Sequence, residues 1–181
     1  MTEAEYKEQV DARANEMIRE TLALDRGNAL WDAHVRMELE PDDDKIIEII
    51  RGHLNRVSGF GTPMTPVSGG VEVDPAEAAT ARIYGGPFEI VPAMMLVARW
   101  GDVLPQAALD HVKRFMTEGI LERGNTEKHW LMFYVGNLLA AQRWPDVEVS
   151  WNGNSPAAIR AEATRWILGM IERTATNGHH E

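Results

Sequence analysis

The side chains best suited to chemistry lie in residues 125–130, the most polar part of an otherwise apolar stretch. At helical spacing Asn125 and His129 stand about one turn apart, and Asn137 continues the same drifting row. Amides beside an imidazole are suited to hold a carboxylate and to move a proton. The competing interpretation is structural, because Asn125 or Thr126 would also cap a helix and Asn137 would be a buried amide bonded to a neighbour.

Two aromatic residues in glycine-rich surroundings are further candidates for ligand contact. Tyr84 precedes a double glycine and would present a phenol at a cavity mouth, unless the glycines are only a hinge between helices. Trp151 stands in a Gly/Asn loop, where a tryptophan serves either as a platform for a sugar ring or as a lid over the core. Both residues therefore have a functional and a structural interpretation.

The histidines do not predict a metal site. His179 and His180 are adjacent, whereas two ring ligands of one ion on a helix need i, i+3 or i, i+4 spacing. His34, His53 and His111 are isolated in polar segments, and we expect them to be solvated. The chain has no phosphate-binding glycine loop, no dinucleotide fingerprint, no nucleophile elbow and no HExxH motif, so no cofactor is predicted either.

Composition limits the class of protein. The 181 residues include 44% hydrophobic residues and no cysteine, which is typical of one soluble domain without disulfides, thiolate zinc sites or cysteine nucleophiles. A formal net charge of −10 disfavours nucleic acid as a partner. No apolar stretch reaches the roughly 20 residues that cross a bilayer. The polar, acidic start predicts a cytoplasmic protein as the sequence is given, or a secreted one if upstream residues are missing.

The period of the apolar residues predicts an all-α protein, since no period-two alternation is long enough for a sheet. Residues 58–74, rich in glycine and proline, are expected to form a long loop. We expect helices over 2–24, 42–57, 75–83, 88–100, 105–120, 126–144 and 157–174, with a short segment over 28–39 between the first two.

Two of these segments are apolar on nearly every side, and each precedes a two-faced helix. The first is 88–100, followed by 105–120, and the second is 126–144, followed by 157–174. Such alternation predicts an inner layer covered by an outer layer, built of about three helical hairpins. It favours a single domain over residues 1–181 that forms part of an α/α toroid or solenoid, rather than a four-helix bundle.

Three short motifs carry a resemblance to a protein family. The chain resembles bacterial and fungal (α/α)6-toroid proteins that are related in architecture to alginate lyase-like and heparinase-like polysaccharide enzymes. The resemblance covers roughly residues 80–181, and Lys128 stands where the family's first motif usually has Asn. The matching positions are Thr126, Glu127 and His129 in a T-E-N-H-type box, Leu139, Ala140, Gln142, Pro145 and Asp146 in a helix-end motif, and Gly178 and Glu181 in a G-x-x-E box.

The resemblance implies a carbohydrate-active protein with an oligosaccharide or small-molecule ligand. In a lyase, Asn125 and Asn137 would bind the uronate carboxylate, while His129 or Tyr84 would handle the proton. In a glycoside hydrolase, Glu127 and Glu181 would be the two carboxylates. Further ligand contacts are expected from Trp130, Trp151 and Glu181.

The resemblance also implies that the sequence is a fragment, because six hairpins need on the order of 300 residues. A partial toroid would leave an apolar edge exposed, through which copies would self-associate. The alternative to an enzyme is a non-catalytic helical module that binds a glycan or a protein through the concave side of its inner layer. An enzyme that acts on isoprenoid substrates is the least favoured of the three hypotheses, because no Asp-rich diphosphate-binding motif lies on an inner helix.

Overall fold

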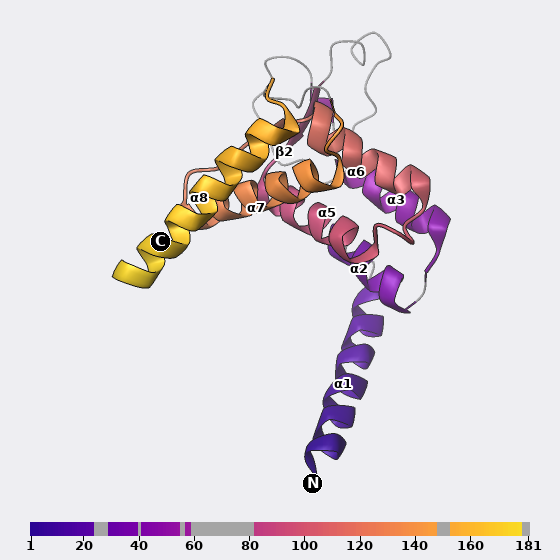
Figure 1. The fold of residues 1–181 in the computed structure, drawn as a ribbon. Helices are drawn as coiled ribbons and strands as arrows, with labels where there is room; N and C mark the ends of the chain where they lie inside the picture. Colours follow the sequence, from indigo (N-terminus) through magenta and orange to yellow (C-terminus); the bar gives the residue numbers. More distant parts are fainter. Residues whose placement is uncertain (24–28, 40, 55–56, 59–81, 148–152, 179–181) are drawn as a thin grey trace.

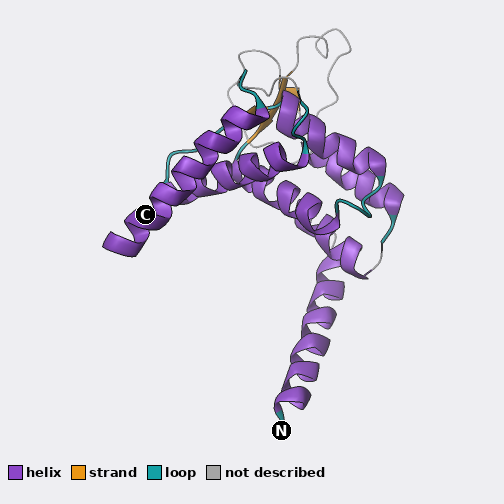
Figure 2. Cartoon of the chain, viewed as in Figure 1, coloured by secondary structure: helices purple, strands orange, loops and turns teal. Residues whose placement is uncertain are grey.

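The computed structural model describes residues 1–23, 29–39, 41–54, 57–58, 82–147 and 153–178. Within these ranges the chain is mostly helical, as predicted, and the strands are short (Figures 1 and 2). The expected loop at 58–74 lies outside the described residues except for Ser58. The elements are α1 Glu3–Ala23, α2 Ala29–Leu39, α3 Asp43–Leu54, β1 Val57–Ser58, β2 Arg82–Gly85, α5 Pro87–Trp100, α6 Gln106–Glu118, β3 Ile120–Leu121, α7 Glu127–Arg143 and α8 Pro156–Asn177.

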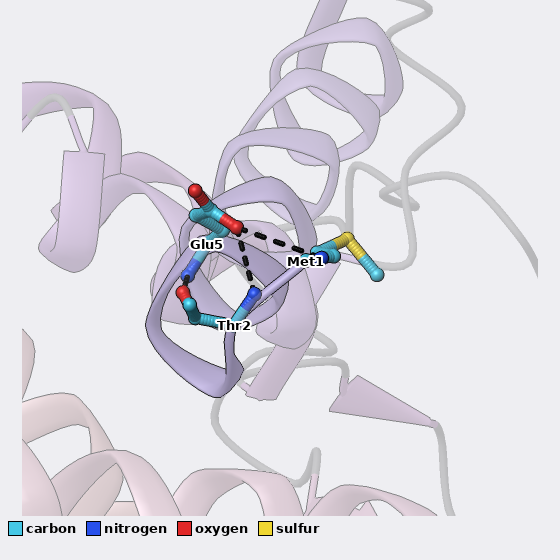
Figure 3. Close-up of polar contacts among 3 residues, drawn as sticks. All are labelled: Met1, Thr2 and Glu5. Carbon is cyan, nitrogen blue, oxygen red and sulfur yellow. Dashed lines mark hydrogen bonds and ion pairs between the residues drawn. The ribbon is translucent and has the colours of Figure 1, made fainter.

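Helix α1 begins with a reciprocal cap. The backbone N of Thr2 donates to Glu5 Oε2 at 2.7 Å, and the backbone N of Glu5 donates to Thr2 Oγ1 at 3.3 Å (Figure 3). This capping box satisfies two backbone donors that the first helical turn would otherwise leave without partners. From its contact with α2 the helix extends away from the other helices (Figure 1), so that Tyr6 is 57% exposed.

The remaining helices pack pairwise around one core. Helix α2 packs on α3 and α5, α3 also packs on α6, and α7 lies between α5 and α8 (Figure 1). The predicted apolar face of α3 is buried at Ile46, Ile50 and Leu54, which have no exposed surface. Of the other residues expected on this face, Ile47 is half-buried and Val57 lies in β1, beyond the end of the helix. Phe115 of α6 is fully buried in the same cluster. The periodic apolar residues thus join α2, α3, α5 and α6 into a single core.

Helices α2, α5 and α7 run in the same direction. Going from α2 to α5, His34 contacts Pro92 and Glu38 contacts Arg99, so residue numbers rise together in both helices. Going from α5 to α7, the ring of Phe88 contacts His129, and Ile90 lies against Gly136.

Helix α7 lies very close to α5. A Cβ atom added at Gly136 would overlap Cγ2 of Ile90, so the glycine is what allows the two helices to approach. The buried residues of this helix are Tyr134, Gly136, Asn137, Ala140 and Ala141, and the other side chains from 130 to 141 are half-buried, so the helix is less fully surrounded than predicted.

The mostly helical chain fits the all-α expectation, and it also carries a small three-stranded sheet that the period of the apolar residues does not predict. Strand β2 pairs antiparallel with β1 through Ile83 and Val57, and parallel with β3 through Tyr84 and Ile120. The helix expected over 75–83 does not include residues 82 and 83, which belong to β2. Strands of two to four residues are too short for their alternation to be detected in a sequence.

Candidate functional site

The polar segment before α7 is a helix cap. Thr126 is the N-cap residue, and its Oγ1 accepts a hydrogen bond from the backbone N of His129 at 3.3 Å. Glu127 follows in the first turn, where a carboxylate complements the helix dipole. The structural interpretation of this segment is therefore confirmed for Thr126, while Asn125 lies exposed just before it.

Glu127 and Trp130 lie on the side of α7 that faces α8. Trp130 meets Trp166 edge to face with ring centroids 5.5 Å apart, and Tyr134 stacks on Trp166 at 5.3 Å. The cavity between the helices has a volume of about 10 Å³, which holds at most about one water molecule. No sugar ring fits there. The cavity is lined by Glu127, Trp130, Leu131, Tyr134, Trp166, Ile167, Met170 and Arg173.

Asn137 is buried, at 6% exposure, and its Nδ2 donates to the carbonyl oxygen of Phe133 at 2.8 Å. Its amide is thus bonded within α7. For Tyr84 the structure gives only the backbone position, in β2 two residues before Gly86, the N-cap of α5. Trp151 and Glu181 lie outside the described residues, as do His179 and His180.

His129 lies apart from Glu127. A step of two residues along a helix rotates the side-chain direction by about 200°, so Glu127 and His129 lie on different faces of α7. The ring of His129 meets Phe88 of α5 edge to face, with centroids 5.2 Å apart. Phe88 itself is 63% exposed. The structure therefore places His129 beside Phe88, which the sequence did not indicate as a candidate site residue.

Helix α5 leaves one stripe uncovered although it is apolar on nearly every side. Phe88, Met95 and Arg99 are exposed and, at spacings of seven and four residues, share one side of the helix, while Pro92 is buried beside them against α2. Met95 on this stripe is 45% exposed. The stripe, unlike the buried faces of α5, is thus available to a ligand.

Helices α2 and α7 flank this stripe. Trp31 of α2 is 44% exposed, and its ring lies 5.3 Å from the ring of His34. Because the helices are parallel, Trp31 and His129 both lie toward the end of α5 that holds Phe88. We call the exposed and half-buried side chains of Trp31, His34, Phe88, Met95 and His129 together the open face.

His34 was expected to be solvated, and this expectation was wrong. The ring is half-buried, and its Nε2 lies 2.9 Å from the carbonyl oxygen of Pro92. Burial lowers the pKa of His34 below its usual 6.5, the hydrogen bond to the Pro92 carbonyl raises this pKa, and the positive charge of Arg99 lowers it. The net direction is downward, so the neutral ring is favoured at neutral pH.

An ion pair lies beside His34 at the far end of the stripe. Arg99 Nη2 is 2.6 Å from Glu38 Oε2, so the guanidinium and the carboxylate neutralise each other across α5 and α2. The guanidinium also lies 4.8 Å from the centre of the Trp100 ring. The open face therefore ends in a charge-compensated pair.

No group of three or more His, Asp or Glu side chains within the described ranges is arranged to hold a metal ion. Among the helices of those ranges, none combines the length and the apolar character that a membrane crossing requires. Comparisons with family models, with curated proteins and with solved structures found no match to this chain.

Proposed function

We propose that the chain recognises an oligosaccharide, or a small molecule of similar chemistry, on the open face. The observation that carries this proposal is the pair of exposed rings, Trp31 and Phe88, each with an imidazole beside it. Sugar rings have apolar C–H faces that stack on aromatic rings and hydroxyls that need hydrogen-bonding partners. His34 and His129 supply such partners next to the two rings.

We also propose that the chain is an arc of an α/α toroid. In this arrangement α2, α5 and α7 form the inner row, while α3, α6 and α8 form the outer row. The common direction of α2, α5 and α7 supports this proposal, because each connecting helix must return outside the row. The open face would then lie on the concave side.

Binding is better supported than catalysis. A hydrolase needs two carboxylates about 5 to 9.5 Å apart, and Glu127 lines the small cavity toward α8 rather than the open face. In the lyase hypothesis Asn137 would hold a carboxylate, but its amide hydrogen bond goes to Phe133 within α7. Recognition without catalysis needs only the groups that the open face carries.

The test is binding of neutral and acidic oligosaccharides to the full chain, for example cellohexaose and a hexamer of guluronate, measured by calorimetry. Trp31→Ala and Phe88→Ala should each weaken binding of the preferred saccharide about tenfold, because stacking area is lost. Tyr6→Ala is the matched control, since Tyr6 is as exposed as the two rings but lies on α1. This variant should bind like the wild type.

Two results would contradict the proposal. One is that neither saccharide binds the wild-type chain. The other is that Trp31→Ala and Phe88→Ala both keep wild-type affinity while circular dichroism shows the wild-type helix content.

A further inference from the structure

The hydrogen bond between His34 and Pro92 determines which ring nitrogen carries the proton. A carbonyl oxygen only accepts hydrogen bonds, so Nε2 of His34, 2.9 Å away, must be the donor. In a neutral imidazole only one nitrogen is protonated, and Nδ1 is then left with its lone pair. Because Pro92 lies within α5, 58 residues further along the chain, the packing of α2 on α5 holds the ring in this state.

We propose that His34 offers Nδ1 on the open face as an acceptor and that a hydroxyl of a neutral saccharide donates a hydrogen bond to it. This inference rests on the proposed function and narrows it to a ligand class. The two ring nitrogens of imidazole point in widely different directions, so a ring that donates through Nε2 to the body of α5 directs Nδ1 away from that helix. A hydroxyl of a sugar ring that stacks on Trp31 would be close to Nδ1 of His34, because the Trp31 and His34 rings are neighbours.

The charges around the ring favour a neutral ligand over a uronate. Arg99 of α5 is the cation that acts on His34, and Glu38 of α2 holds Arg99 in an ion pair. A carboxylate next to Nδ1 would face a lone pair rather than a donor. The net charge of −10 on the chain further disfavours a polyanion.

The state of the ring is measured without a ligand, by long-range ¹H–¹⁵N NMR of the full chain labelled at histidine. At about pH 7.5 the His34 ring should be the neutral tautomer with the proton on Nε2, and its titration midpoint should lie below 6.5. An Nδ1–H tautomer, or an imidazolium at that pH, would overturn the inference whatever the chain binds.

The role of Nδ1 in recognition is measured with cellohexaose as the neutral probe and the guluronate hexamer as the acidic one. His34→Gln retains an N–H that reaches toward the Pro92 carbonyl but removes the ring acceptor, so cellohexaose should bind about tenfold more weakly. Wild-type affinity should fall as the pH is lowered through the midpoint of the His34 titration, because protonation removes the Nδ1 lone pair that accepts the hydrogen bond from the hydroxyl. The affinity of His34→Gln should change less over the same change in pH.

The outcomes separate the two proposals. If the wild type binds cellohexaose and His34→Gln binds it equally well, the role of His34 is overturned and the proposed function stands. Tighter wild-type binding of the uronate than of cellohexaose at about pH 7.5 overturns the neutral ligand class alone. If neither probe binds the wild type, the proposed function fails, and the ligand part of this inference fails with it.

Discussion

Replacing Phe115 by alanine is expected to lower the free energy of unfolding by about 3–5 kcal/mol, the usual cost of deleting a buried aromatic ring. Phe115 has no exposed surface, and its ring lies so close to Gly85 that a Cβ atom there would overlap it. The ring therefore joins α6 to β2, the strand that leads into α5. Because a domain of this size is stable by only about 5–15 kcal/mol, this variant should unfold at markedly lower urea concentrations.

Phe88→Ala is the matched control for this substitution. It removes the same ring from α5, but the ring is 63% exposed, so the free energy of unfolding should change by no more than about 1 kcal/mol. The two variants thus distinguish an aromatic residue of the core from one of the open face. Equal losses of stability in the two variants would contradict the packing described for α5 and α6.

Gly136→Ala is expected to destabilise the chain by about 1–3 kcal/mol, although alanine forms helices better than glycine does. The new methyl group would overlap Cγ2 of Ile90, and a β-branched side chain has little freedom to move aside. Either α5 and α7 separate or Ile90 leaves its preferred rotamer. Chemical denaturation of the purified variant measures the loss.

Gly169→Ala is the control, because it makes the same change inside α8, where the nearest atom to the new methyl group is Arg173 Nη1 at 3.9 Å. Here only helix propensity acts, and the chain should gain about 0.5–1 kcal/mol. The two substitutions should therefore have effects of opposite sign. If both stabilise the chain, α5 and α7 do not approach as closely as described.

Long, strongly periodic segments could be predicted from the sequence because burial of an apolar stripe is what selects the helix. The period of the apolar residues places Ile46, Ile50 and Leu54 on one face of α3, and all three are buried there. The same period places Ile171, four residues after Ile167, on the inward side of α8, yet its side chain is 58% exposed. Ile171 lies near the end of α8, where periodicity alone does not tell whether a neighbouring helix reaches far enough to cover it.

The candidate site was harder to predict than the helices. The Thr126 cap could be predicted, because its chemistry is local to the chain. The open face could not, since it depends on which side of α5 remains uncovered, and an all-apolar helix gives no indication of that side. The half-buried position of His34 depends on its contact with Pro92. A contact between residues so far apart in the chain has no sequence pattern of its own.

The ¹⁵N–¹H indole signals of the six tryptophans provide the most direct measurement of where a saccharide binds. On titration of the full chain with cellohexaose, the Trp31 signal should shift, while the signals of Trp130 and Trp166, which lie between α7 and α8, should stay in place. Shifts confined to Trp130 and Trp166, with Trp31 unchanged, would contradict recognition on the open face.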